Sequence, residues 1–303
     1  MIGHLGAMKE RLAYWFRGER GLAFLLIAPL ICLLAGLIAY PLVVAFYLSL
    51  TNQRIGSGGE FIGLANFAEL LKDETFVQTA ENALLYTVVA VGLKTILGLA
   101  LALALATLGT HASWVRTLML LPWVVPISIT ALAWWWMFDP LYSVLNRGLQ
   151  LLGQDPVPWL SDPFWARTSV ILVNVWRGLP FFAIIFLAGL LAIPRELYEA
   201  AEVDGAKPLQ SFIYITLPLL KPILGLVVLY SVVMTIADFE IVYILTRGGP
   251  MNTTHLFATY AFQVGLQGTL IGKGAAIALF IFPALAMAAY FTLRLIRRGE
   301  EYA

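Results

Sequence analysis

The sequence predicts an all-α membrane protein with six transmembrane helices. Three observations predict this class: the composition, the long apolar runs and the distribution of basic residues. Hydrophobic residues make up 60% of the 303 residues, charged residues make up only 12%, and the mean hydropathy is +0.84. A soluble domain carries about 25% charged residues. The composition therefore favours a chain that is largely surrounded by lipid.

Six apolar runs are long enough for spanning helices, each of which needs about 20 mostly apolar residues. The runs cover residues 21–48, 84–108, 115–138, 169–193, 217–237 and 275–295. They do not alternate between apolar and polar residues as the strands of a membrane barrel do, so we expect helices. The first run follows a basic segment, as in a secretory signal, but it is too long for one. We expect a retained anchor.

The basic residues predict the orientation of the spans, because cytoplasmic loops carry an excess of Lys and Arg. One side has many of them in short segments: Lys9, Arg11, Arg17, Arg20, Arg116, Arg195, Lys207, Arg294, Arg297 and Arg298. We therefore expect both termini to be cytoplasmic, with an N-terminal segment over 1–20, a six-span domain over 21–298 and a tail over 299–303. The single cysteine, Cys32, lies in the first run, so no disulfide framework is expected.

The loop over residues 194–218, between the fourth and fifth runs, is polar and predicts two short helices joined at a glycine. Pro194 and Glu196 suit the start of a helix, where proline fits and an acidic side chain meets the positive end of the dipole. Gly205 is a natural helix break, and Pro218 is expected to bend or end the second helix. The alternative is an interfacial helix on lipid headgroups, but such helices are usually basic, and this one is acidic.

Within this loop, one pattern reads E-A-A, three residues, G, nine residues, I-x-L-P. It resembles the cytoplasmic coupling loop of bacterial ATP-binding-cassette importer permeases. The resemblance implies that the loop docks in a groove of a separate ATPase subunit. The implied coupling positions are Glu199, Ala200, Ala201, Asp204, Gly205, Ile215, Leu217 and Pro218.

Two shorter motifs, the G-L-x-N-F stretch at 63–67 and the L-T-x-G-G-P stretch at 245–250, also resemble sugar-importer permeases. The wider group includes the maltodextrin and glycerol-3-phosphate importers. The resemblance implies a type I importer permease fold in the bacterial cytoplasmic (inner) membrane. It also implies a role as one of two transmembrane subunits of an ATP-driven carbohydrate importer. The implied partners, besides the lipid bilayer, are a second homologous permease, an ATPase dimer, an extracytoplasmic solute-binding protein and a carbohydrate substrate.

No cofactor is expected in this chain, because the resemblance assigns ATP-Mg to the partner ATPase. Residues 268–274 superficially resemble a phosphate-binding loop, but they lack its four-residue gap and its following Ser or Thr. The net charge of +1 gives no reason to expect a nucleic-acid partner. His4, His111 and His255 are too far apart in sequence to predict a metal site.

Ionisable residues inside spans point to a transport route, because charge is costly in lipid. Spans four and five each carry four residues at helical spacing on one face. These substrate-path candidates are Asn174, Arg177, Gly178 and Phe181, and then Ser231, Met234, Thr235 and Asp238. Polar groups and aromatic rings suit a sugar, whose hydroxyls need hydrogen bonds and whose CH faces stack on rings.

Aligned on W-x-G-x-P and on L-T-x-G-G-P, these eight positions resemble the sugar-contacting positions of the larger maltodextrin permease. The counterparts of Arg177 and Asp238 there are uncharged. We predict that Arg177 and Asp238 form a pair on facing helices near the path. Two alternatives stay open: the pair only packs helices, or Arg177 binds an anionic group of the substrate.

Several other features have alternative interpretations. Lys94 in span two either contributes to the route or only snorkels or pairs within the bundle. Pro122 and Pro126 are expected to break the start of span three. The cluster Trp134-Trp135-Trp136, which ends this span, is typical of an interfacial belt, and a sugar-stacking platform is the alternative. A secondary transporter would usually show inverted repeats, which we do not find. An intramembrane enzyme would need a nucleophile and base within the spans, and none stands out.

Overall fold

The computed structural model describes residues 19–108 and 113–300, so His4, His111 and most of the two predicted terminal segments lie outside the described residues. Within the described residues every secondary-structure element is helical, apart from two isolated β-bridges. Five helical stretches are long and apolar enough to cross a membrane, and one bent pair brings the number to six if the pair is one span. The predicted all-α class with six spans is confirmed.

The helices that form the spans are α2 (Glu19–Leu34), α3 (Tyr40–Ser49), α5 (Glu74–Thr107), α6 (Ser113–Met119), α7 (Leu121–Val124), α8 (Ile127–Met137), α10 (Pro163–Leu191), α13 (Leu217–Ile236), α16 (Ile271–Leu279) and α17 (Ile281–Glu300). The shorter helices between them are α4 (Ala65–Leu70), α9 (Val144–Leu151), α11 (Arg195–Val203), α12 (Pro208–Ser211), α14 (Glu240–Leu245) and α15 (Phe257–Phe262). Three π-helical turns complete the described elements: Ala35–Ala39, Phe212–Thr216 and Gln263–Gln267.

The third span, predicted over 115–138, is broken near its start, as its prolines predict. It consists of α6 and α7 followed by α8, and the two parts are bent by 88°. Val125 is extended, with φ −65° and ψ 136°, because the ring of Pro126 disfavours the helical conformation in the residue before it. Pro126 therefore sets the break, and the short helix α7 before it lies against α10.

Helices α5 and α10 begin well before their apolar runs over 84–108 and 169–193. Helix α5 begins at Glu74 because the side chain of Asp73 accepts hydrogen bonds from the backbone N–H groups of the next turn. Helix α10 begins at Pro163 because Asp162 does the same. Their first turns are polar and lie beyond the apolar runs, so a count of apolar residues alone misses them.

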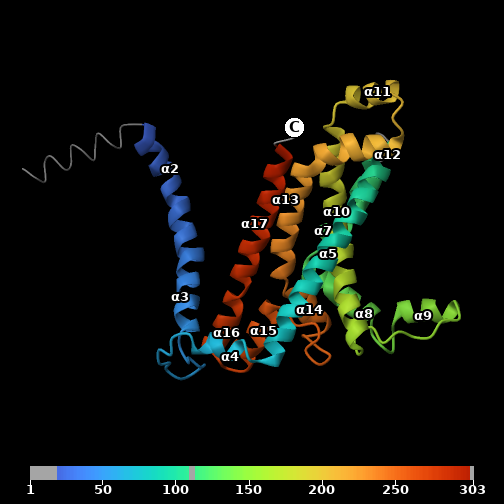
Figure 1. The fold of residues 1–303 in the computed structure, drawn as a ribbon. Coiled ribbons are helices and arrows are strands. Elements are labelled where there is room, and N and C mark those ends of the chain that lie inside the picture. The colour runs from blue at the N-terminus through green and yellow to red at the C-terminus, as the bar shows by residue number, and fades with distance from the viewer. Residues whose placement is uncertain (1–18, 109–112, 301–303) are drawn as a thin grey trace, which may run out of the picture.

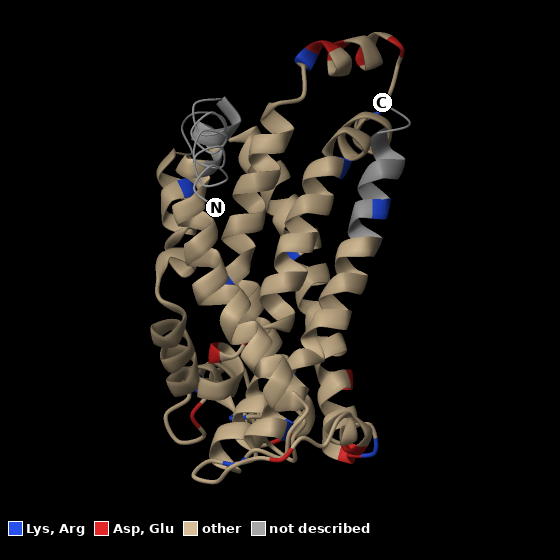
Figure 2. Ribbon diagram, turned by 90° about the vertical axis from the view of Figure 1, so that its left-hand side faces the viewer, with Lys and Arg blue, Asp and Glu red and all other residues tan. Residues whose placement is uncertain are grey.

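The helices form a bundle in which α5 packs against α10, and α13 packs against α5, α10 and α17. Figure 1 shows that α2 begins and α17 ends at the same end of the bundle, where α11 and α12 also lie. The first span stands apart from the others along most of its length, and α3 packs on α16. Charged residues gather toward the two ends of the bundle, with few between them (Figure 2).

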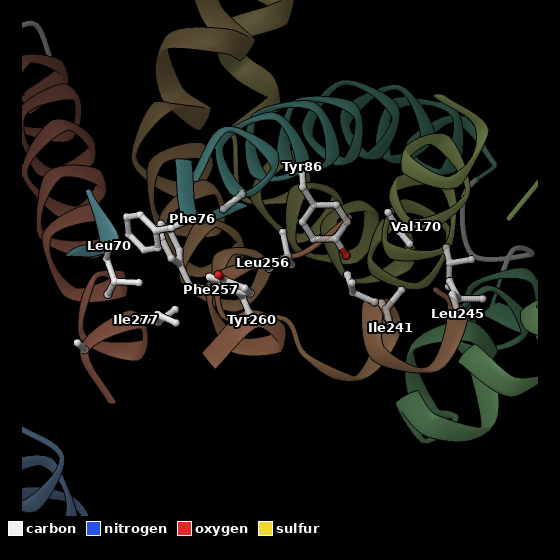
Figure 3. Close-up of a cluster of buried hydrophobic side chains, with 14 of the residues drawn as sticks. Leu70, Phe76, Tyr86, Val170, Ile241, Leu245, Leu256, Phe257, Tyr260 and Ile277 are labelled. Atoms are coloured by element: carbon white, nitrogen blue, oxygen red, sulfur yellow. The ribbon is translucent and has the colours of Figure 1, made fainter. Parts of the chain in front are cut away.

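The larger buried core (Figure 3) lies around α4, α14, α15 and α16, at the end of the bundle opposite α11 and α12 (Figure 1). Phe76 packs against Phe257 and Phe280, with ring centroids 5.9 and 4.7 Å apart. Residues from α4, α5, α10, α14, α15 and α16 contribute to the same cluster. This core packs the short helices and loops at that end against the ends of the spans. We refer to this packed region as the cap.

The motif residues at this end have structural roles. Asn66 of the G-L-x-N-F stretch is buried, and its Nδ2 donates hydrogen bonds of 2.8 Å to the carbonyls of Ser49 and Thr51, at the end of α3. A Cβ on Gly272 would collide with the Thr51 carbonyl. The glycine-rich stretch that resembles a phosphate loop therefore allows α16 to approach this backbone closely.

His255 and Tyr260 lie in the same cap, outside the spans. Burial lowers the pKa of His255 to about 4, so its imidazole is neutral at physiological pH. Burial, together with the neighbouring Asp73 carboxylate, raises the pKa of Tyr260 to about 12, and its hydroxyl donates to Asp73 at 3.1 Å. Both side chains stay uncharged across the physiological range, so the cap is not expected to change charge with pH through them.

Candidate functional site: a transmembrane cavity and an exposed helical loop

The structure brings all eight predicted substrate-path residues to one open cavity of about 450 Å³. Asn174, Arg177, Gly178 and Phe181 come from α10; Ser231, Met234 and Thr235 come from α13; and Asp238 follows α13. Lys94 from α5, Trp123 from α7, Glu240 from α14 and Tyr230 from α13 also contribute to its polar and aromatic lining. Helical spacing on two spans was enough to select residues that share one space.

A buried hydrogen-bond network crosses the cavity wall. The ammonium group of Lys94 donates to Oδ1 of Asn174 at 2.8 Å and to the hydroxyl of Thr235 at 3.0 Å. The amide of Asn174 donates to Oδ2 of Asp238 at 3.1 Å, and the hydroxyl of Tyr86 donates to the same oxygen at 2.7 Å. Asn174 therefore links a cation to an anion through one amide group, in the wall of the cavity.

This network corrects the predicted pair between Arg177 and Asp238. Among the described residues, the ion pair that the structure contains joins Lys273 and Asp73 at 3.6 Å, and Arg177 and Asp238 do not meet within ion-pair distance. Asp238 is committed to Tyr86 and Asn174 instead. The sequence pattern identified both residues as neighbours of one cavity but assigned the wrong partner, because Tyr86 and Lys94 belong to a third helix.

Lys94 is 5% exposed and makes its hydrogen bonds inside the bundle, and it also lines the cavity. Gly178 leaves space for the same side chain, because a Cβ at this position would lie 2.6 Å from Cδ of Lys94. The stem of Lys94 crosses α10 at this point, and glycine leaves the room for it.

Aromatic rings line one side of the cavity. Trp123 stacks on Phe181 with centroids 5.5 Å apart and an angle of 17° between the planes, and Phe181 packs against Tyr230 at 5.2 Å. The predicted cluster of three tryptophans is not part of the lining; Trp134 packs on Phe138 and Trp176. The sequence signal for Trp123 was its place between the two prolines that break the third span.

Two polar groups of the cavity residues have no hydrogen-bond partner among the described residues. Nε of Arg177 and Oγ of Ser231 are buried and make no hydrogen bond. Ser231 is 3% exposed, and both residues line the cavity. A buried polar group without a partner is costly, so each is a position where a bound molecule would supply the missing bond.

A second site lies at the end of the bundle where α2 begins and α17 ends. Helix α11 carries Glu199, Ala200 and Ala201 and has no buried residue. It ends in a Schellman motif: the N–H of Ala206 donates to the Ala201 carbonyl at 2.9 Å and that of Gly205 to the Glu202 carbonyl at 3.0 Å. Gly205 has φ +77°, which glycine adopts without strain.

Pro218 was predicted either to bend or to end the second helix of the loop. It does not end it, because the chain stays helical past this residue. Helix α12 continues through the π-helical turn Phe212–Thr216 into α13, and the helical stretch runs from Pro208 to Ile236. Figure 1 shows α12 lying across the end of the bundle, with α13 running into it. The hydroxyls of Tyr198 and Thr216 lie 2.8 Å apart and tie α11 to this segment.

The other predicted coupling residues lie between the end of α11 and the first turn of α13. Asp204 and Gly205 are exposed at the end of α11, whereas Ile215 and Leu217 are half-buried on either side of the buried Thr216. An open pocket of about 670 Å³ separates α11 from the ends of α5 and α10. Within the described residues, no group of three or more His, Cys, Asp or Glu side chains is arranged to hold a metal ion.

Comparisons with known proteins agree with this geometry. Residues 94–297 match the family described as the binding-protein-dependent transport system inner membrane component. The chain is 37% identical over 299 residues to the sulfoquinovosyl glycerol transport system permease protein SmoG of Agrobacterium fabrum, covering 96% of this chain and 97% of that protein. It is 36% identical to the trehalose/maltose transport system permease protein MalF of Thermococcus litoralis, covering 87% and 90% of the two chains.

Among solved structures, a bacterial ABC transporter involved in the import of the acidic polysaccharide alginate has a similar chain, with a TM-score of 0.82 and 25% identity over 95% of this chain and 99% of that one. The MetNI methionine ABC transporter, at 18% identity and a TM-score of 0.54, shares the fold. The type I importer fold and the transporter class are thereby confirmed against the secondary-transporter and enzyme alternatives. The chain belongs to the family of binding-protein-dependent transport system inner membrane components.

Proposed function

We propose that this chain is one of the two transmembrane subunits of an ATP-driven carbohydrate importer in the bacterial inner membrane. Its partners would be a second permease, an ATPase dimer and an extracytoplasmic solute-binding protein. Relatives named for sulfoquinovosyl glycerol and for trehalose and maltose support a carbohydrate substrate. The single observation that carries the proposal is the cavity with paired polar and aromatic walls, in the same chain as an exposed helix that carries the E-A-A motif.

In this proposal each site has one task. Helix α11 and Gly205 dock in a groove of an ATPase subunit, and closure of the two ATPases moves the loop and the attached span α13. The cavity then opens toward the solute-binding protein, which releases its sugar. Hydroxyls of the sugar replace water at Ser231 and Thr235, and its CH faces stack on Phe181 and Trp123. Hydrolysis of ATP on the partner reverses the movement.

The proposal is tested by purifying the chain through an affinity tag from its own membrane. An ATPase subunit and a second permease are expected to co-purify in stoichiometric amounts. Reconstituted in liposomes with the solute-binding protein, the complex should take up sugar only when ATP is present on the ATPase side. Uptake that runs on an ion gradient without ATP would contradict the proposal.

The orientation of the chain is a separate prediction. Cysteines placed at Ser57 and Ser161, in a chain whose Cys32 is replaced by serine, are expected to react in intact cells with a thiol reagent that does not cross the membrane. A cysteine at Gln210 should react only after the membrane is opened, because α12 lies at the opposite end of the bundle from both serines. All three positions are exposed, so access decides the result. Labelling of Gln210 in intact cells would place the coupling loop outside.

A further inference from the structure

The charged groups that line the cavity differ in whether they are already paired. Lys94 and Asp238 are joined through Asn174, and Asp238 also accepts from Tyr86. Glu240, at the exposed rim, accepts a hydrogen bond of 2.7 Å from the hydroxyl of Ser128. Arg177 is the exception among these ionisable residues, because within residues 19–108 and 113–300 it forms no ion pair and its buried Nε has no hydrogen-bond partner.

We propose that Arg177 binds an anionic group of the transported sugar, a carboxylate or a sulfonate, while Ser231 binds a hydroxyl of the same molecule. The inference rests on the proposed function and names the substrate class of the same cavity. A guanidinium group presents a planar fork of donors that matches two oxygens of a carboxylate or sulfonate. Its charge remains at every physiological pH.

The positions of the neighbouring side chains fit one ligand. Phe181 follows Arg177 by four residues on α10, so the aromatic wall and the cation lie on the same face of one helix. Ser231, which is 3% exposed and has an unpaired hydroxyl, lines the cavity from α13. A sugar stacked on Phe181 thus has a cation toward one helix and an unpaired hydroxyl toward the other, within one space of about 450 Å³.

Neither of the two carboxylates that line the cavity, Asp238 and Glu240, forms an ion pair with Arg177 in place of a ligand. Asp238 already accepts two side-chain hydrogen bonds on Oδ2 and one of 3.4 Å from the N–H of Ile241 on Oδ1. Its charge is offset by Lys94 through Asn174. Glu240 remains a negative neighbour, and replacing it with glutamine is expected to strengthen the binding of an anion at Arg177.

The test uses the detergent-solubilised complex of both permeases and the ATPases without the solute-binding protein, so that only the transmembrane cavity selects the ligand. Three methyl glycosides of glucose are compared that differ only at C6: the hydroxymethyl, the carboxylate and the sulfonate. At least one anionic glycoside is expected to raise the melting temperature in a concentration-dependent manner, and the neutral one is not. An equal effect of the neutral glycoside, or no effect of any of the three, would overturn the inference.

The variants separate binding from folding. Arg177→Gln is expected to raise the half-saturating concentration of the anionic glycoside about tenfold or more, since a charge-assisted hydrogen bond is lost. Arg177→Lys should fall between the wild type and Arg177→Gln, because it retains the charge without the fork. Arg147→Gln is the matched control, since Arg147 is exposed on α9 and does not line the cavity. An unchanged concentration dependence in Arg177→Gln would exclude this residue as the anion site.

The same preparation keeps the two proposals apart. If the complex lacks an ATPase subunit, the proposed function fails whatever the glycosides do. If the ATPase is present and the solute-binding protein stimulates it, but the three glycosides do not differ, the importer function stands and only the anionic substrate class is rejected.

Discussion

Replacing Gly205 with proline is expected to abolish stimulation of ATP hydrolysis by the loaded solute-binding protein and to weaken retention of the ATPase subunit. Gly205 has φ +77°, whereas the proline ring holds φ near −65°. Proline also lacks the N–H that donates to the Glu202 carbonyl at 3.0 Å. Both changes break the Schellman motif that sets the direction in which the chain leaves α11. The ATPase rate of the reconstituted complex, with and without binding protein, measures the effect.

A matched control exists at the other end of the molecule. Gly153 follows α9, has φ +73°, donates its N–H to the Gln150 carbonyl at 3.0 Å and has open space around its Cα, as Gly205 does. Gly153→Pro should therefore impose the same local strain without uncoupling ATP hydrolysis. Gly205→Asn should be milder than Gly205→Pro, because asparagine tolerates the left-handed conformation. Normal stimulation in Gly205→Pro would remove the coupling role from this loop.

The charge of α11 gives a weaker form of the same result. Glu199 is exposed on a helix with no buried residue, so Glu199→Lys should leave the fold intact and alter only what docks there. Reduced retention of the ATPase with normal insertion of the permease is the expected outcome within this first prediction.

Neutralising one member of the Lys94–Asn174–Asp238 network is expected to reduce the yield and melting temperature of the complex strongly. Removing either charge leaves the other without the opposite charge across Asn174 inside the bundle, and an uncompensated charge there is destabilising. Lys94→Met would strand the Asp238 carboxylate and leave Oδ1 of Asn174 without its donor. Asp238→Asn would strand the Lys94 ammonium group. The double variant carries neither charge, so it should recover much of the loss.

A double-mutant cycle on the melting temperature measures this coupling. The second cycle combines Arg177→Gln with Asp238→Asn, and its losses should be close to additive, since these two side chains do not meet within ion-pair distance. Rescue in the second cycle and additivity in the first would show that Arg177, not Lys94, compensates Asp238, and would contradict the network.

Two helical faces could be chosen from sequence because a helix repeats every 3.6 residues, and that period places residues without knowledge of the neighbours. Asn174, Arg177 and Phe181 were selected in this way, and they line one cavity with the residues from span five. The glycine break at Gly205 was predictable for a similar reason: its signal is local, a glycine after a short acidic helix. The role of either set in transport or coupling stays a prediction.

Hydrogen-bond partners within the bundle were beyond the sequence. Lys94 contacts Asn174 and Thr235, which lie 80 and 141 residues further along the chain. Tyr86, one of a dozen tyrosines, gives no sign in the sequence that it binds Asp238 across 152 residues. Arg177 meets the same requirement for a positive charge near Asp238 as Lys94 does. Only the relative rotation and height of the three helices decided that Lys94, and not Arg177, is joined to Asp238 through Asn174.

The sequence by itself determined that this chain spans a membrane six times, where its helices lie and which faces of spans four and five are polar, because hydropathy and period are properties of consecutive residues. Only the tertiary structure decided that Trp123, before the bend at Pro126, stacks on Phe181, and which charges are paired and which is left open. Those outcomes depend on how helices pack, since a buried polar group takes whichever partner packing brings within hydrogen-bond distance.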